Sequence, residues 1–436
     1  MKKSIVSVLL LAITFGFFGK SKAQEKDSLY EARKLKIDEI NFVSGYYTQE
    51  GDHSSIGGGK GDEALTNISN SIQVRLLKNS QKYEHRLDVA VAVDHHTSAS
   101  TKLINNVPDG SPTNIYSGKI SAKTAASSGT SGVTGASSKF VGWRIYPSIN
   151  YFAKNLERNT TYGIGAYYSR EFDYQSIGGE LSFVKSSQDN NAEFSVKAMA
   201  FFDQRLEILP VELRPVNTGV NNKKADDDED EDEHEGNDDN YKLWNKNSYS
   251  VNFAYSQIIN PRLQVSLLAD FAFQDGLLSI PYNRVYFTNN TVSSEKLPMQ
   301  RMKIPLGMRL NYFLGETFIF RTYYRYFFDD WGIKAHTAQL EIPIKISPFV
   351  SLSPFYRYHH QTSNDYFKPY GQHNPGEKYY SSDYDLSSFN SQNIGLNLHY
   401  LPLESKIFKS VDFRYSFYKR SEGLSAHNLT FAITFK

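Results

Sequence analysis

The stretch from Met302 to Tyr358 alternates with a period of two residues, and this pattern restricts the fold more than any other feature of the chain. Every even position from Met302 to Tyr312 is apolar or aromatic, whereas the odd positions include Lys303 and Arg309. The same alternation returns three more times before Tyr358. Because successive side chains of a β-strand point to opposite faces, the stretch predicts four consecutive antiparallel strands with one apolar face and one charged face.

Strand length indicates where the apolar face lies. Alternation by itself also fits a soluble sandwich, in which the apolar face looks inward. These segments are about 10 to 15 residues long, whereas globular strands average about five or six, and about ten residues cross a bilayer when tilted. The chain also has 30 Tyr and 29 Phe, which form aromatic girdles in membrane barrels. Because an open edge leaves backbone groups unpaired in lipid, we predict a closed all-β transmembrane barrel.

The N-terminal region has the layout of a secretory signal. Two lysines precede an apolar run, and Ser21-Lys22-Ala23 has the small residues of a cleavage site. We therefore expect residues 1–23 to be a cleaved signal peptide, residues 24–36 to be a periplasmic leader, and residues 37–436 to be a barrel in the cell outer membrane. The chain has no Cys, which excludes disulfides, thiolate metal sites and cysteine nucleophiles.

The alternation continues along the chain and predicts about 16 strands. They cover about 37–49, 69–78, 83–97, 139–153, 160–172, 175–186, 191–203, 246–259, 262–274, 301–314, 317–328, 332–346, 349–362, 390–401, 406–419 and 424–435. The connections alternate strictly between short and long. Bacterial outer-membrane barrels have short periplasmic turns and long external loops, so we predict an antiparallel up-and-down barrel of this kind.

The charged face of the predicted strands carries mainly arginine. In a barrel these side chains line the lumen. The predicted lumen residues are Arg144, Arg309, Arg321, Arg325, Arg357, Arg414 and Glu341. Two interpretations remain open. Inward charges either neutralise one another as part of the structure, or a ladder of arginines attracts anions and narrows an anion pathway.

Histidine and aspartate gather at the predicted external strand ends. The residues of this external mouth are Asp94, Asp329, Asp330, Trp331, His336, His359, His360 and Asp365. Imidazole with carboxylate suits zinc, copper or iron, and the candidate metal ligands are His95, His96, His336, His359 and His360. Neighbouring histidines of one strand point to opposite faces, which limits this hypothesis. The alternative is that polar side chains simply lie where water is.

An acidic run stands out within a predicted external loop at about 217–243. Eleven acidic residues lie between Asp226 and Asp239. Oxygen ligands suit a hard cation, so the run is a candidate calcium site, but it lacks the glycine and the spacing of an EF-hand loop. A solvated, disordered insertion is the alternative interpretation.

Catalytic and nucleic-acid signatures are missing from the sequence. It contains no G-x-S-x-G elbow, Walker loop, H-E-x-x-H motif or dinucleotide fingerprint. We therefore expect a protein that is not an enzyme. The aromatic residues are predicted to face lipid, which argues against nucleic acid as a partner.

Several segments resemble a known protein family. They are NYFLG (311–315), YYRYFFDDWGIKAHTA (323–338), FYRYH (355–359), DYF (365–367), SDYDL (382–386) and VELRP (211–215). These segments are similar to bacterial outer-membrane proteins, mostly from Bacteroidota, that are grouped as domain-of-unknown-function family 3570. The resemblance covers nearly the whole mature chain. It implies an outer-membrane barrel and no agreed activity, and the acidic run departs from the family pattern.

Together these features favour a conduit or ligand-binding barrel. Its lumen is predicted to be basic, and its His/Asp-rich external mouth would take a metal or a small anion. The alternative is a non-transporting accessory barrel of a larger outer-membrane assembly. The expected partners are outer-membrane lipid and, for the second hypothesis, other outer-membrane or periplasmic proteins.

Overall fold

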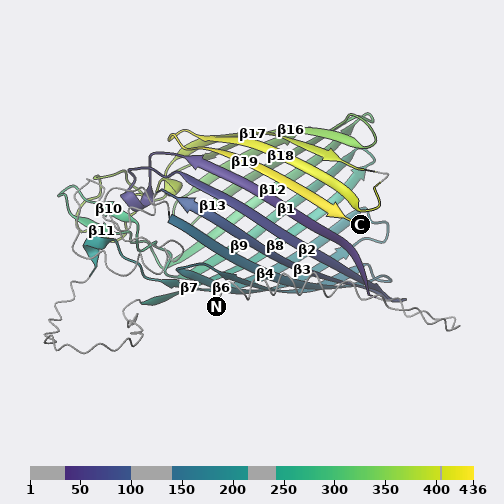
Figure 1. The fold of residues 1–436 in the computed structure, drawn as a ribbon, viewed down its shortest axis with the longest axis horizontal. Helices are drawn as coiled ribbons and strands as arrows, with labels where there is room; N and C mark the ends of the chain where they lie inside the picture. Colours follow the sequence, from purple (N-terminus) through teal and green to yellow (C-terminus); the bar gives the residue numbers. More distant parts are fainter. Residues whose placement is uncertain (1–34, 100–139, 215–241, 403–404) are drawn as a thin grey trace, which may run out of the picture. The chain divides into compact units, whose positions relative to one another are not determined.

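Long antiparallel strands follow one another around a closed barrel (Figure 1). The computed structural model describes residues 35–99, 140–214, 242–402 and 405–436. The wall strands are β1 (Lys36–Glu50), β2 (Leu65–Asn79), β3 (Tyr83–Ser98), β4 (Phe140–Asn155), β5 (Thr160–Arg170), β6 (Tyr174–Ser186), β7 (Ala192–Leu206), β8 (Leu243–Asn260), β9 (Leu263–Gly276), β12 (Gln300–Leu314), β13 (Phe318–Asp329), β14 (Lys334–Glu341), β15 (Ile344–Lys345), β16 (Val350–Gln361), β17 (Phe389–Tyr400), β18 (Phe408–Arg420) and β19 (Ser425–Phe435). β1 pairs with both β2 and β19, which closes the sheet.

β14 and β15 together form one wall strand that is interrupted at Ile342 and Pro343. Both pieces pair with β13 on one side and with β16 on the other. Proline has no N–H to donate to the ladder, so the regular pairing stops there. The 17 strands of the sheet therefore make 16 wall strands. This confirms the predicted all-β, antiparallel up-and-down barrel.

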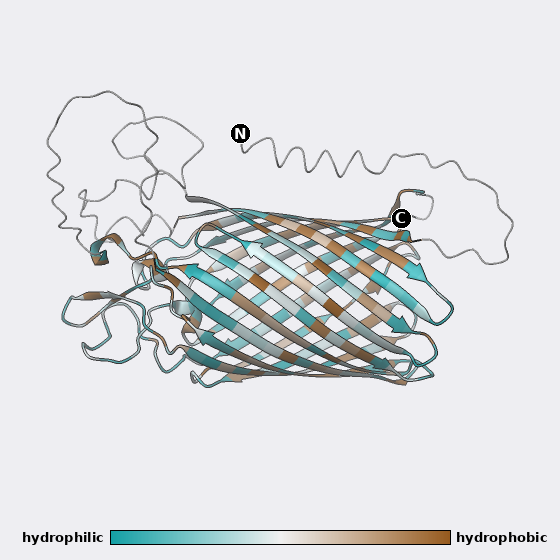
Figure 2. Cartoon of the chain, turned by 90° about the horizontal axis from the view of Figure 1, so that it is seen from below, coloured by the Kyte–Doolittle hydropathy of each residue, from teal (hydrophilic) through white to brown (hydrophobic). Residues whose placement is uncertain are grey.

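Each wall strand presents one face outward and one face inward, and hydropathy alternates along the strands (Figure 2). The outward side chains are large and apolar; Leu181, for example, leaves 62% of its surface exposed. Tyr356 and Phe413 are also exposed on this side. A continuous apolar outer surface of this kind suits lipid. Within the part of the chain that the structure describes, no helix is long and apolar enough to cross a membrane.

The two ends of the barrel differ in their connections. One end, the turn end, holds the connections 80–82, 156–159, 187–191, 261–262, 315–317 and 346–349 and the described residues between β17 and β18. The other end, the loop end, holds the connections 51–64, 171–173, 277–299, 330–333, 362–388 and 421–424, and the described residues at the ends of two longer connections, between β3 and β4 and between β7 and β8. The long connections lie at the loop end and the turn end has short ones, as predicted, but three loop-end connections are also tight, so the alternation is not strict. β1 starts and β19 finishes at the turn end.

Described loop segments fold together at the loop end, and we call residues 51–64, 207–214, 277–299 and 362–388 the cap. The cap contains the short helices η1 (Ser55–Gly57), η3 (Val211–Leu213) and η4 (Tyr384–Leu386), and the strand pair β10 (Arg284–Tyr286) and β11 (Val292–Ser294). These segments are the short elements at the end of the barrel that carries the β10 and β11 labels in Figure 1.

Arg284 ties three cap segments together. Its side chain is fully buried, and its Nη2 donates to Glu212 Oε2 at 3.0 Å. Its Nη1 donates to the Ile56 carbonyl oxygen at 2.9 Å. Because charged hydrogen bonds are roughly twice as strong as neutral ones, this single side chain holds β10 against both η1 and η3.

Candidate functional site

The structure places the seven lumen residues predicted from the sequence on the inner face of the wall. Six of the seven are flanked in their strands by an apolar or aromatic side chain that is exposed on the outer face. These neighbours are Trp143, Ile145, Met308, Tyr324, Leu340, Tyr356, Tyr358, Phe413 and Tyr415. Arg321 is flanked by Phe320, which has the same parity as the exposed Tyr324 and is itself half-buried. Since side chains alternate along a strand, the arginines and Glu341 point inward.

Two adjoining cavities follow this inner face along β12, β13 and β16. One cavity of about 300 Å³ is lined by Arg325, Arg357 and His359. The next, of about 580 Å³, is lined by Arg309, Arg321 and again Arg357. Arg321 and Arg325 are four residues apart on β13, which corresponds to about 13 Å along a strand. The guanidinium groups are therefore spaced along the barrel axis, and they form a row.

Most members of this row have no carboxylate partner. Arg321 Nη1 lies 3.2 Å from Glu341 Oε1. Among the ion pairs of the described residues, none involves Arg309, Arg325 or Arg357. The row therefore carries several positive charges that the surrounding wall leaves uncompensated, and such charges raise the local concentration of anions.

Aromatic rings support two of the inward arginines. The Arg309 guanidinium lies 5.4 Å from the centroid of the Tyr323 ring. That of Arg414 lies 4.3 Å from the centroid of the Phe355 ring. A ring face attracts a cation without neutralising its charge, so these contacts orient the side chains and leave their N–H groups available to a solute.

The part of the wall from β3 to β8 is closer to electrical balance than the arginine row. Arg144 lies there, apart from the row, and its Nε donates to Ser169 Oγ at 2.9 Å. Asp94, predicted as a mouth residue, accepts a hydrogen bond from Tyr146 Oη at 2.9 Å on the same wall. Sequence reasoning missed the acidic residues of this wall, although the alternation also points them inward. They include Glu180 and Asp203, which pair with Lys197 and Lys246.

Four predicted mouth residues meet in the β13–β14 corner. The buried carboxylate of Asp329 pairs with Arg301, whose guanidinium lies 4.3 Å from the centroid of the Trp331 ring. Asp330 Oδ1 accepts from the backbone N–H of Met302, and Asp365 N–H donates to the Trp331 carbonyl oxygen. These contacts hold the residues of the corner to one another, and they explain this group of polar residues as part of the structure.

Gly332 allows the corner to form. Its φ is +93°, and an added Cβ would lie 2.4 Å from Asp365 Oδ1. We expect Gly332→Ala to lower the free energy of unfolding by about 1–3 kcal/mol, because a non-glycine residue is strained at this φ and the Asp365 carboxylate must move. The control is Gly371→Ala, which has φ +69° and nothing within 4 Å of the added Cβ. Denaturant titration in detergent measures both; equal losses would contradict a role for the Asp365 contact.

The five candidate metal histidines do not come together. His95, His336 and His360 lie on the outer face, where they contact Trp143, Tyr324 and Asn390 respectively. His96 and His359 lie on the inner face of different strands; His96 pairs with Glu171, and His359 bonds to Thr337. Among the described residues, no group of three or more His, Cys, Asp or Glu could hold a metal ion. The structure therefore does not bring these five histidines together in one site, because strand alternation separates neighbouring histidines.

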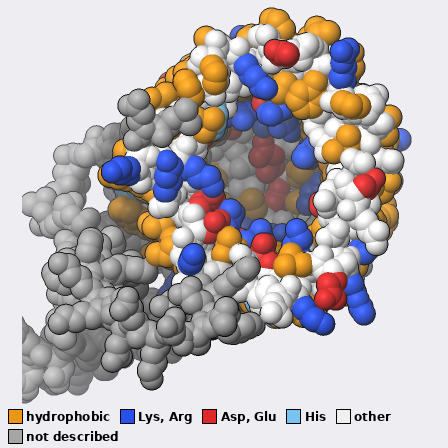
Figure 3. Space-filling model, turned by 90° about the vertical axis from the view of Figure 1, so that its right-hand side faces the viewer, with side chains coloured by type: hydrophobic (Ala, Val, Ile, Leu, Met, Phe, Trp, Pro, Cys, Tyr) orange, Lys and Arg blue, Asp and Glu red, His pale blue; other side chains and the backbone are white. Residues whose placement is uncertain are grey.

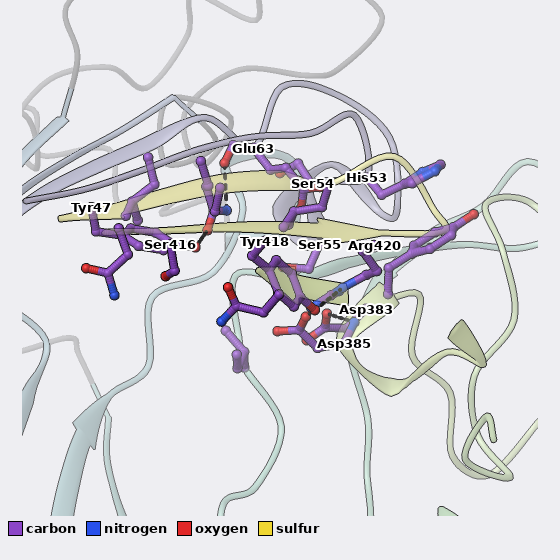
Figure 4. Close-up of a pocket in the computed structure, with 18 residues that line it drawn as sticks. Tyr47, His53, Ser54, Ser55, Glu63, Asp383, Asp385, Ser416, Tyr418 and Arg420 are labelled. Atoms are coloured by element: carbon purple, nitrogen blue, oxygen red, sulfur yellow. Dashed lines mark hydrogen bonds and ion pairs between the residues drawn. The ribbon is translucent and has the colours of Figure 1, made fainter. Parts of the chain in front are cut away.

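A further cavity of about 600 Å³ lies between the cap and the wall strands β1, β18 and β19. The wall contributes Tyr47, Tyr418 and Arg420, and the cap contributes Ser54 and Asp383 (Figure 4). We call this space the cap cavity. The sequence analysis did not select these residues. The inward positions of Tyr418 and Arg420 follow from the same alternation that placed Arg414. Nothing in the sequence near these two residues indicates that they contact the cap.

Charge in the cap cavity is largely compensated. Arg420 Nη1 donates to Asp385 Oδ1 at 2.8 Å. Burial raises the pKa of the Asp383 carboxyl well above its usual range, and repulsion by Asp385 and Glu295 adds to this. Desolvation also raises the pKa of Glu63. Raised pKa values shift both carboxyls toward the uncharged form, and Arg420, which also lines the cavity, is already paired with Asp385.

Several predicted segments lie outside the described residues. They are the signal peptide, nearly all of the periplasmic leader, and the acidic loop from residue 217 to residue 241. The signal peptide and the candidate calcium site therefore stay predictions.

Several solved structures are similar to this chain over most of its length. The chain is similar to a BenF-like porin from Pseudomonas fluorescens Pf-5, with 7% identity, a TM-score of 0.40, and coverage of 91% of this chain and 98% of that chain. It is also similar to OccK7 (OpdD) of Pseudomonas aeruginosa, with 8% identity, a TM-score of 0.35, and coverage of 91% of this chain and 97% of that chain. A bacterial polysaccharide outer membrane secretin matches with 9% identity, a TM-score of 0.42, and coverage of 93% of this chain and 99% of that chain. Similarities this distant say nothing about activity. No curated protein matches the chain significantly.

The family resemblance has direct support. A family model described as "Protein of unknown function (DUF3570)" matches residues 5–429. This match covers nearly the whole chain and confirms the resemblance found in the segments of the β13–β14 corner and the cap. The chain therefore belongs to the DUF3570 family.

Proposed function

We propose that the protein is a passive outer-membrane conduit biased toward small anions. The supporting observation is the arginine row, whose members line two adjoining cavities inside a closed barrel. Three of its four members, Arg309, Arg325 and Arg357, have no carboxylate partner among the described residues. A barrel of this size is wide enough for a channel unless loops fill it. Guanidinium groups present several N–H donors in a planar fork that suits carboxylate and phosphate oxygens.

The turn end fits this proposal. Figure 3 shows a hollow at this end, with Lys and Arg side chains at its rim and Asp and Glu side chains among them. The cationic side chains of the rim attract anions to the opening. In the predicted orientation the turn end faces the periplasm, so this rim would attract anions that enter the conduit from that side.

Reversal potentials in planar bilayers test the proposal. With purified full-length protein and a tenfold KCl gradient, we expect a reversal potential whose sign shows that chloride permeates faster than potassium. The preference should decrease as ionic strength rises, because salt screens the arginines. Cation preference, or the absence of conductance from properly folded barrels, would contradict the proposal. A silent barrel that co-purifies with other outer-membrane proteins would instead support the accessory role.

A further inference from the structure

We propose that the cap cavity binds a neutral sugar of one or two rings. This inference goes beyond the anion conduit and does not require it. Figure 4 shows the arrangement on which it rests: wall residues Tyr47, Ser416 and Tyr418 on one side, with the cap residues Ser54 and Asp383 nearby.

The wall side of the cavity carries two tyrosines, Tyr47 and Tyr418. Tyr47 on β1 lies opposite Asn428 on β19, which in turn lies opposite Ser416 on β18. Tyr418 lies opposite Ala426 on β19. Since Ser416 and Ala426 are small, space remains between the two phenol rings. Aromatic side chains bury large apolar faces, and the C–H face of a pyranose ring is a matching surface.

Polar atoms that lack partners point to a hydrogen-bonding ligand. The Ser54 side chain is only 1% exposed, and its Oγ has no hydrogen-bond partner. Asn393 Oδ1, which also lines the cavity, is buried without a partner as well. Buried polar groups are almost always paired, with protein or with water. A sugar hydroxyl both donates and accepts, so it can satisfy a serine hydroxyl and an amide oxygen alike.

Charge distribution favours a neutral ligand here. Arg420 is paired with Asp385, so the cavity offers no free guanidinium to an anion. The cavity lined by Arg325 and Arg357 does offer unpaired guanidinium groups, and it adjoins the cap cavity through Asn393 and Tyr418. The two spaces therefore differ in ligand class, the inner one for anions and the cap cavity for uncharged hydroxyl groups. The volume of about 600 Å³ is within the range of small-molecule sites.

Isothermal titration calorimetry of the purified full-length barrel tests this inference. The detergent should be an amine oxide, because a sugar-headed detergent would compete. The probes are glucose, galactose, mannose, xylose and maltose, with glucuronate as the anionic comparison. We expect saturable binding of at least one neutral probe and at least tenfold weaker binding in Tyr47→Ala and Tyr418→Ala. Tyr418→Phe should bind nearly as well as the unchanged protein, because it keeps the ring.

The matched control is Tyr146→Ala, which removes an inward tyrosine of β4 outside this cavity. Its affinity for the sugar should be unchanged, and heat-dependent gel mobility confirms that every variant is a folded barrel. The inference is overturned if no neutral probe binds saturably, if only glucuronate binds, or if both tyrosine variants bind as the unchanged protein does. Because calorimetry needs no ion flow, sugar binding without anion conductance would refute the proposed conduit and leave this inference intact.

Discussion

Replacing Arg325 and Arg357 together by glutamine is expected to lower the chloride-to-potassium permeability ratio by about tenfold. Both guanidinium groups line the smallest cavity of the row, about 300 Å³. A single charge about 4 Å from a passing ion contributes about 1 kcal/mol in water. Two such charges therefore favour chloride by roughly thirtyfold and disfavour potassium by a similar factor. Mobile salt screens most of this effect, which leaves the expected tenfold change in the ratio. Glutamine keeps polarity and approximate length, so the change isolates the charge.

Arg144→Gln is the matched control for this prediction. It removes the same charge from the inner face of the barrel, but on the wall where acidic side chains are abundant. Its reversal potential should stay close to that of the unchanged protein. If the double variant also keeps the original selectivity, the arginine row does not control permeation, and its charges serve only the structure of the wall.

The wall was predictable because two different environments act on alternate side chains. Lipid outside and polar groups inside impose a period of two, which is visible in the sequence without any alignment. β12 is an example: the predicted strand 301–314 is observed as Gln300–Leu314. β14 and β15 show the limit, since the pattern continues through Pro343 while the backbone pairing does not. Hydrophobic alternation predicts which way side chains face, and backbone chemistry decides where hydrogen bonding stops.

The contacts within the cap were not predictable in the same way. Arg284 and Glu212 are 72 residues apart, and nothing near either residue indicates its partner. Alternation did predict that His359 and His360 diverge, and the structure shows His359 bonded to Thr337 and His360 to Asn390. Periodicity thus predicts well which face of a strand a side chain occupies. Contacts between loops that are distant in the sequence depend instead on how the whole barrel closes.

Arg284→Met is expected to open the cap while the wall stays folded. Removing one partner of a buried ion pair costs about 3–5 kcal/mol. Glu212 keeps 18% of its side chain exposed, so water reaches it and we expect a cost of about 3 kcal/mol. The Ile56 carbonyl also loses a donor. Trypsin should then cleave within 51–64 or 277–299 at least tenfold faster, which limited proteolysis followed by mass spectrometry measures.

Two further variants decide whether the ion pair itself holds the cap. Lys378→Met removes an exposed cation of the cap and should leave the cleavage rate unchanged. Arg284→Met combined with Glu212→Leu removes both charges, and replacing a buried pair by apolar residues is often neutral, so this double variant should recover most of the protection. Equal cleavage of the single and double variants would instead mean that the size and shape of Arg284, and its bond to the Ile56 carbonyl, hold the cap. Rapid cleavage of wall strands in Arg284→Met would show that the cap and the barrel unfold together.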